Sequence, residues 1–166
     1  MAELGRKSVE EFKASAKTPI ILVLENIRSA YNVGSVFRTS DAFLVQSIYI
    51  IGYSAKPPHK EIKKTALGAE ETVEWKYFKT TAEAITELRE AGFNVYAAEQ
   101  AEGSYKLNAI GFEPEEKIAV VFGNEVTGVE QSTIALCDGC LEIPQLGMKH
   151  SLNIATAAGV VLWELV

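Results

Sequence analysis

Uninterrupted apolar residues fill four segments of the chain, each about as long as a β-strand. Such runs are typical of strands buried on both faces, as in a parallel sheet. A further segment alternates apolar and charged residues, which predicts a half-exposed or edge strand. A last, shorter segment is also strand-like. In chain order, the predicted strands are IILVLE (20–25), SIYIIG (47–52), TVEWKYF (72–78), FNVYAAE (93–99), KIAVVFG (117–123) and CLEIP (140–144).

The segment Asn32–Leu44 has the spacing of a helix rather than a strand. Its start, Asn32-Val33-Gly34, occupies the predicted turn from strand to helix. Arg38 points nearly opposite the apolar face of this helix, because successive residues are about 100° apart around the axis. The face predicted to meet the core carries Val33, Val36, Phe37, Phe43 and Leu44.

Other helices are predicted between the remaining strands. Thr80 and Glu83 form a capping box that starts one helix, and Gly92 ends it. A short helix is expected near Gln131–Cys137 and a last helix from about Ser151, whereas KPPHKEIKKTALGA reads as a loop with one helical turn. Strands that alternate with helices predict an α/β domain with a mainly parallel sheet flanked by helices.

Length and composition predict one globular domain. A chain of 166 residues, 48% hydrophobic and 23% charged, is ordinary for such a domain. We expect a single domain over 1–166, with 1–18 as an N-terminal extension before the first strand. No apolar run approaches the roughly 18 residues of a membrane span, and the acid-containing N-terminus is no secretion signal. A cytoplasmic location is expected by default.

The net charge of −6 hides an asymmetry along the chain. Residues 1–80 carry 12 Lys and Arg against 9 Asp and Glu, whereas residues 81–166 carry 4 against 13. The overall acidity argues against a protein that coats nucleic acid indiscriminately. The local excess of lysine suits a selective anionic partner, and its alternative is a solvated lysine-rich loop. The lysines gather in KPPHKEIKK as Lys56, Lys60, Lys63 and Lys64.

The two cysteines, Cys137 and Cys140, form a single C-x-x-C. A zinc site needs about four ligands, and the two histidines, His59 and His150, are far apart in the sequence. No metal site is therefore expected. A thioredoxin-like redox pair would start a helix, whereas this pair leads into the strand-like CLEIP. Two reduced thiols are the preferred interpretation, and a thiol redox protein is the alternative.

Unusual polar and glycine-rich stretches follow four of the predicted strands. Ligands of parallel α/β sheets bind beyond the carboxyl ends of the strands, so these stretches predict a site. Ordinary turn chemistry explains their glycines but not the gathering of Arg38, Glu125 and Asn153 at one edge. The alternative for Arg38 is a surface arginine that meets only water. The four stretches are ENIRSAYNVG, AAEQAEGS, FGNEVTG and IPQLGMKHSLN.

Three motifs in this order carry a resemblance to a known family. They are N-V-G-S-V-F-R (32–38), F-G-N-E-V-T-G (122–128), and I-P-Q-L-G (143–147) followed by S-L-N (151–153). Together they resemble the SpoU (TrmH-like) branch of the SPOUT superfamily of RNA ribose 2′-O-methyltransferases. The resemblance implies an α/β fold with a C-terminal deep trefoil knot, S-adenosylmethionine as cofactor, and a homodimer. The small residues of the last helix predict close packing against another helix, in this chain or, as the resemblance implies, in a second copy.

The resemblance also implies roles for individual residues. Arg38 matches the family's catalytic arginine, which could act as a general base. Because a guanidinium hardly ever deprotonates, bidentate binding of a phosphate and of the developing alkoxide is an equally good role. A loop that wraps the cofactor leaves no room for a side chain at Gly123. The implied catalytic and supporting residues are Arg38, Asn32, Glu125, Ser151 and Asn153, and the implied cofactor-binding residues are Ala98, Gly123, Ile143, Ser151 and Leu152.

The RNA would be gripped by the core itself, since no separate RNA-binding domain is expected. The residues expected to contact it are Arg28, Lys56, Lys60, Lys63 and Lys64, with Arg6 and Lys7 as additions. A compact RNA such as tRNA is favoured, and ribosomal RNA is the other candidate. A catalytically silent RNA-binding relative is a rival interpretation, and the three intact motifs argue against it.

Overall fold

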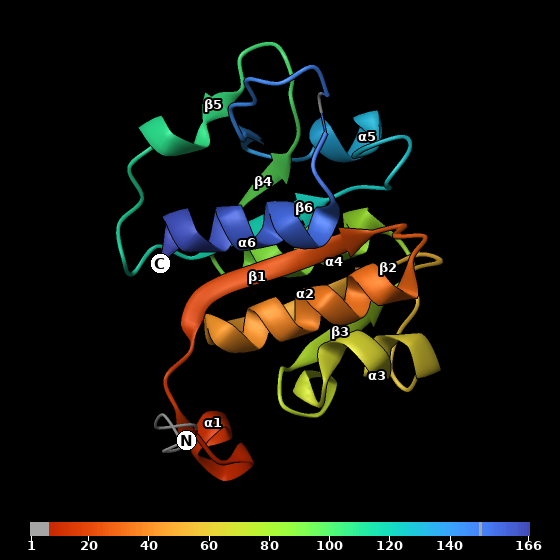
Figure 1. Cartoon of the computed structure of the whole chain (residues 1–166). Helices are drawn as coiled ribbons and strands as arrows, with labels where there is room; N and C mark the ends of the chain where they lie inside the picture. The colour runs from red at the N-terminus through yellow and green to blue at the C-terminus, as the bar shows by residue number, and fades with distance from the viewer. Residues whose placement is uncertain (1–6, 150) are drawn as a thin grey trace.

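The computed structural model describes residues 7–149 and 151–166, and it is built around a seven-stranded sheet (Figure 1). The strand order is β3-β2-β1-β6-β4-β7-β5, and every pairing in it is parallel. The strands are β1 (Thr18–Glu25), β2 (Val45–Ile51), β3 (Trp75–Phe78), β4 (Asn94–Ala98), β5 (Tyr105–Lys106), β6 (Ile118–Phe122) and β7 (Gly139–Glu142).

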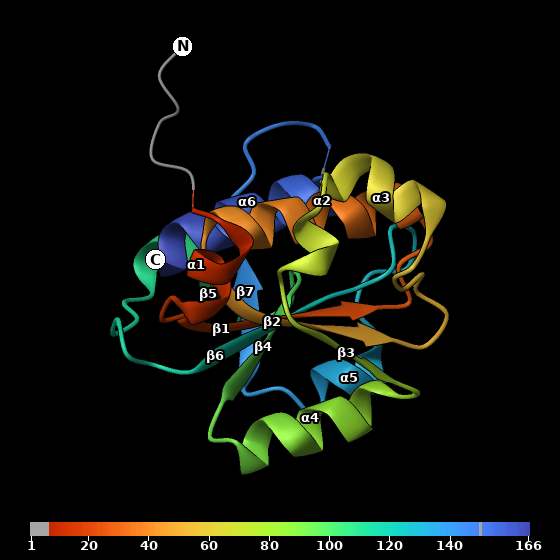
Figure 2. The same ribbon diagram turned by 90° about the horizontal axis from the view of Figure 1, so that it is seen from below.

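Helices cover both faces of this sheet, as Figure 2 shows from below. One layer contains α2 (Ala30–Ala42), α3 (Lys60–Ala66) and α6 (Ile154–Leu165), and the other contains α4 (Thr81–Glu90) and α5 (Gln131–Ile134). Shorter elements are α1 (Val9–Ala14) and the 3-10 turns η1 (Ala69–Glu71) and η2 (Leu107–Ala109). The predicted α/β class with a mainly parallel sheet flanked by helices is confirmed.

The burial of the strands explains why the apolar runs predicted them well. Every residue of β6 is buried, as are residues 20–25 of β1, because the central strands have helices on both faces. The alternating strand β3 lies at the edge of the sheet, as its pattern predicted. The capping box of Thr80 and Glu83 starts α4, and Gly92 follows its end with a left-handed φ of 83°.

Some local predictions differ from the structure. The helix α2 ends at Ala42, and Leu44 adopts a φ of 52°, so Phe43 and Leu44 lie in the turn to β2 rather than on the helix. The segment expected as a loop with one turn contains the seven-residue helix α3. The two-residue strand β5 was not expected, because so short a segment leaves no periodic pattern.

Gly34 lies inside α2, not in the turn before it. A Cβ atom at this position would stand 2.2 Å from the Thr65 hydroxyl and 2.4 Å from the carbonyl oxygen of Ile62. The glycine therefore lets α3 approach the backbone of α2 closely. This contact fixes the lysine-bearing helix α3 beside the start of α2.

Within the described residues, no helix is both long and apolar enough to cross a membrane. These residues share the one sheet and its two helical layers, and the single-domain boundary of 1–166 stays a prediction. The trefoil knot implied by the resemblance likewise stays a prediction.

Candidate active site

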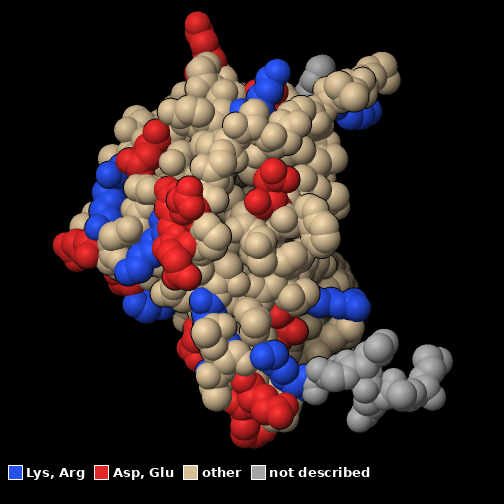
Figure 3. Space-filling view, turned by 90° about the vertical axis from the view of Figure 1, so that its left-hand side faces the viewer, with Lys and Arg blue, Asp and Glu red and all other residues tan. Residues whose placement is uncertain are grey.

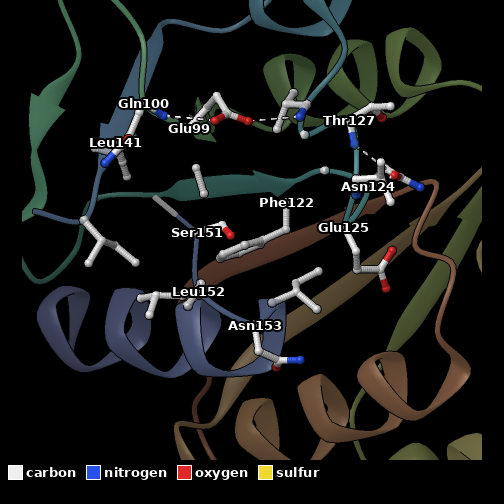
Figure 4. A pocket seen from close by; sticks show the side chains of 18 of the residues that line it. Glu99, Gln100, Phe122, Asn124, Glu125, Thr127, Leu141, Ser151, Leu152 and Asn153 are labelled. Atoms are coloured by element: carbon white, nitrogen blue, oxygen red, sulfur yellow. Dashed lines mark hydrogen bonds between the residues drawn. The ribbon is translucent and has the colours of Figure 1, made fainter. Parts of the chain in front are cut away.

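A cleft of about 690 Å³ lies at the carboxyl ends of β4, β6 and β7 (Figure 4). Its walls are the loop after β6, the loop between β7 and α6, and the first residues of α6. The volume falls in the range of small-molecule sites. The cleft brings together these residues that the motifs singled out: Ala98, Gly123, Glu125, Ile143, Ser151, Leu152 and Asn153.

Asn124 holds the loop after β6 in shape. Its side-chain oxygen accepts from the backbone N–H groups of Val126 and Thr127, at 2.8 and 3.1 Å. Its side-chain nitrogen donates to the carbonyl of Asn26 and to the hydroxyl of Tyr53, at 2.9 and 2.8 Å. Sequence reasoning gave Asn124 no role, although an asparagine after glycine is a common turn signal.

Gly123 is enclosed by the same loop. A Cβ atom there would lie 2.2 Å from backbone atoms of Gly128 and Val129. The close approach was expected to be to the cofactor, but the structure shows it to the loop's own backbone. A side chain at 123 must therefore displace this turn.

A chain of hydrogen bonds joins Glu125, Asn32 and Asn153. The Asn32 side chain donates from Nδ2 to Glu125 Oε1 at 3.0 Å, and its Oδ1 accepts from Asn153 Nδ2 at 3.0 Å. Asn153 Oδ1 caps α6 by accepting from the backbone N–H groups of Ala155 and Thr156. The chain ties the loop after β6 to the first turns of α2 and α6, and it fixes the orientation of both amides.

Glu125 also caps the start of α2. Its carboxylate accepts from the backbone N–H groups of Arg28 and Ser29, at 2.9 and 3.1 Å. Burial would raise the pKa of the Glu125 carboxyl, but the hydrogen bonds from Arg28, Asn32, Ser29 and its own backbone N–H outweigh it and lower this pKa. The group is therefore a carboxylate at neutral pH and serves as an acceptor.

Glu99 lines the cleft at the end of β4, and sequence reasoning missed it. Its carboxylate accepts from the backbone N–H groups of Val129 and Gln100, at 3.2 and 3.1 Å (Figure 4). It thus joins β4 to the loop after β6. A single glutamate at a strand end has no distinguishing pattern, so nothing in the sequence separated it from a surface acid.

Within a single copy of the chain, Arg38 does not line the cleft. It is exposed on α2, six residues beyond Asn32, which corresponds to about 9 Å along the helix axis. Among the described residues, its guanidinium has no hydrogen-bond or ion-pair partner. Its predicted position opposite the apolar face is confirmed, while its catalytic role stays a prediction.

The lysines expected to bind RNA lie on the other side of α2 from α6. Lys56 is on the loop after β2, and Lys60, Lys63 and Lys64 are exposed on α3. Lys56 Nζ stands 3.7 Å from the ring centroid of Tyr77. Arg28 is exposed, and its backbone N–H donates to Glu125 of the cleft. Arg6 lies outside the described residues.

The raised pKa values of the two cysteine thiols do not suit a redox pair. Burial is the main cause that raises the pKa of the Cys137 thiol to about 12, and burial also raises the pKa of Cys140. Reactive thiols need a lowered pKa. No group of three metal-binding side chains occurs among the residues that the structure describes.

Sequence comparison finds relatives along nearly the whole chain. The chain is 32% identical to the tRNA (guanosine(18)-2′-O)-methyltransferase of Thermus thermophilus, over 98% of this chain and 81% of that protein. It is 30% identical to the 23S rRNA (guanosine-2′-O-)-methyltransferase RlmB of Vibrio parahaemolyticus, over 99% of this chain but only 65% of that protein.

Structural comparison points the same way. The Aquifex aeolicus TrmH/SpoU tRNA modifying enzyme shares the fold, with a TM-score of 0.83 at 23% identity over 95% of this chain and 78% of that one. The AdoMet-bound rRNA methyltransferase of Sinorhizobium meliloti has a TM-score of 0.83 at 27% identity over 90% of this chain and 56% of that one. The family model described as the SpoU rRNA Methylase family matches residues 19–163. The chain therefore belongs to the SpoU rRNA methylase family.

Proposed function

We propose that the chain is a methyltransferase that moves a methyl group from S-adenosylmethionine to a ribose 2′-hydroxyl of RNA. The observation that carries this proposal is that the loops of the second and third motifs form one cleft, while Asn32 of the first motif is hydrogen-bonded to both. Membership of the SpoU rRNA methylase family and the methyltransferases among its relatives support the same reaction. A location in the cytoplasm is part of the proposal.

The residues of the cleft fit this cofactor. Phe122, Leu141, Ile143 and Leu152 offer apolar surface to an adenine ring, and the backbone of the two loops offers hydrogen-bonding groups. The carboxylate of Glu99 adds negative charge beside a cofactor whose sulfonium and ammonium groups are positive. We assign Ala98, Gly123, Ile143, Ser151 and Leu152 to cofactor binding.

When bound, the cofactor supplies an activated methyl group, so the protein must position the ribose hydroxyl and help its proton leave. We assign Arg38 to the RNA, where its two-pronged guanidinium would hold the neighbouring phosphate and the charge that develops on the 2′-oxygen. Asn32 is a positioning residue, because Glu125 and Asn153 already engage its amide. We assign Ser151, which lines the cleft, to the polar groups that support the reaction.

Transfer RNA is the favoured substrate within this proposal. The chain covers 81% of the Thermus tRNA methyltransferase, whereas it covers 65% of the Vibrio rRNA methyltransferase. Ribosomal RNA remains the second candidate.

Methyl transfer from labelled S-adenosylmethionine to total RNA tests the reaction. The RNA should come from a strain that lacks the protein, and the labelled nucleoside should carry its methyl on the ribose 2′-oxygen. Changing Cys137 and Cys140 together to serine should leave the transfer intact, because neither thiol has a role. Transfer to a base, or no transfer to any RNA although the protein binds the cofactor, would contradict the proposal and favour a silent relative.

We further propose that the protein acts as a homodimer through the outer face of α6. Three apolar side chains of this helix and its end are uncovered, namely Val160 (39% exposed), Trp163 (77%) and Val166 (67%). Figure 3 looks from the side on which α6 ends, and the middle of this face is largely without charged side chains, with one acidic patch within it. A second copy would bury this surface and bring its own Arg38 near the interface.

Sedimentation at micromolar concentration should therefore give twice the chain mass of 18.1 kDa. Trp163→Glu should produce monomers, because it buries an unpaired charge in the interface. Leu136→Glu is the matched control, since Leu136 is also exposed but follows α5 in the opposite helical layer. A monomeric protein with full activity would refute the interface.

A further inference from the structure

A second, mainly apolar slot of about 490 Å³ lies between the start of α3 and the edge strand β3. Its walls include Trp75 at the start of β3 and the loop residues Pro57, Pro58 and His59. Trp75 is half-buried, and its strand pairs only with β2, so the slot opens at the margin of the sheet. It is separate from the proposed cofactor cleft, with which it shares no lining residue.

Charged side chains of both signs line this slot. Lys60 and Lys63 line it, Lys56 lies over Tyr77 on the same edge strand, and all three lysines are exposed. His59 Nδ1 accepts from the backbone N–H of Glu61 at 3.1 Å, so a neutral His59 carries its proton on Nε2 and can donate there. Glu70 and Glu71 also line the slot, where a carboxylate can accept from N–H groups.

The slot is connected to the cofactor cleft by one loop. Asn124, which shapes the cleft, donates to the hydroxyl of Tyr53 at 2.8 Å, and Tyr53 begins the loop that leads to His59. The chain from Tyr53 to His59 spans at most about 22 Å. Tyr53 is itself 65% exposed. A single strand of RNA with one ribose at the cleft can therefore extend along this loop.

We propose that the slot of Trp75 and His59 holds an unpaired RNA base a few nucleotides from the methylated ribose. This inference rests on the proposed RNA substrate. It adds a second contact to the RNA, through which the protein would prefer RNAs that carry an unstacked base at this distance from the methylated ribose. Aromatic rings bind bases by stacking, and lysines beside them bind the phosphates. A protein segment would fill the apolar slot equally well, but it would leave the surrounding lysines without phosphate partners.

Tryptophan fluorescence tests this contact directly. Trp163→Phe leaves Trp75 as the sole tryptophan, because the chain has two. A single-stranded hexamer of adenosines should quench this fluorescence, whereas the same ribose-phosphate backbone without bases should not. Absence of quenching by the adenosine hexamer, or equal quenching by the abasic strand, would overturn the proposal.

Kinetics on total RNA provide the second measurement. Trp75→Val and His59→Asn should each raise the KM for RNA, about tenfold for Trp75→Val because a stacked base is lost, with kcat and cofactor affinity unchanged. Valine suits an edge strand, and asparagine can still cap α3. Lys106→Ala, at the opposite sheet edge, is the control that should change nothing.

The outcomes also separate this inference from the proposed function. If the unaltered chain methylates RNA but both variants keep a normal KM, the slot has no role in binding and this inference is wrong. If the unaltered chain methylates no RNA, the proposed function fails, and the fluorescence result still decides whether the slot takes a base.

Discussion

Changing Arg38 to alanine should slow methyl transfer about a hundred- to a thousandfold, the usual loss when a group that stabilises developing charge is removed. Arg38 is exposed on α2, so its removal leaves no cavity in the core. It does not line the cofactor cleft. The melting temperature and the affinity for S-adenosylmethionine should therefore stay at their normal values, and the loss should be confined to turnover.

Arg38→Lys separates the two roles open to this residue. Lysine supplies a charge but lacks the planar fork, so little recovery of turnover would favour bidentate binding of phosphate and alkoxide. Recovery that rises with pH, as the amine loses its proton, would favour a general base. Single-turnover rates measured across pH distinguish these results. Normal turnover of Arg38→Ala would mean that Arg38 contacts only solvent and has no role in the reaction.

Changing Gly123 to valine should abolish measurable binding of S-adenosylmethionine and also destabilise the protein. The first added carbon would stand 2.2 Å from the backbone of Gly128 and Val129, so the turn that forms one wall of the cleft must move. Overpacking of this kind costs about 1–3 kcal/mol of unfolding free energy. Calorimetry of cofactor binding and urea unfolding measure the two effects.

Gly147→Val is the matched control for this experiment. Gly147 belongs to the loop between β7 and α6, but a Cβ atom there would meet no other atom within 4 Å. Its variant should therefore keep its stability. If Gly123→Val instead binds the cofactor with normal affinity, the cofactor cannot depend on this turn, and the cleft would be assigned to another ligand.

Sequence predicted the parts of this protein that leave a regular pattern. The buried strands were found because helices cover both faces, which makes their residues apolar throughout. Residues of the second and third motifs met in one cleft because parallel strands bring their carboxyl ends to the same edge of the sheet. By contrast, the local sequence could not show that Gly34 allows α2 and α3 to pack closely, because its neighbour in space, Thr65, is thirty-one residues later in the chain.

Contacts between distant segments account for the other omissions. Glu25 ends an apolar strand and is buried, which its charge would not suggest. Its carboxylate is satisfied by the hydroxyls of Thr81 and Thr133 and by the backbone N–H of Glu130. These partners come from α4 and from the start of α5, so the glutamate joins the second helical layer to the sheet. Only the folded structure shows that a buried acid there is paired.

The hydrogen bond between Asn32 and Asn153 has a consequence for synthesis of the chain on the ribosome. The two residues are separated by 121 positions, and Glu125 is 93 positions from Asn32. Most of the sheet can form while the last segment is still being translated, but the start of α2 lacks its Asn153 partner until that segment has emerged. A nascent chain would thus acquire its assembled cleft last, so that incomplete chains stay inactive.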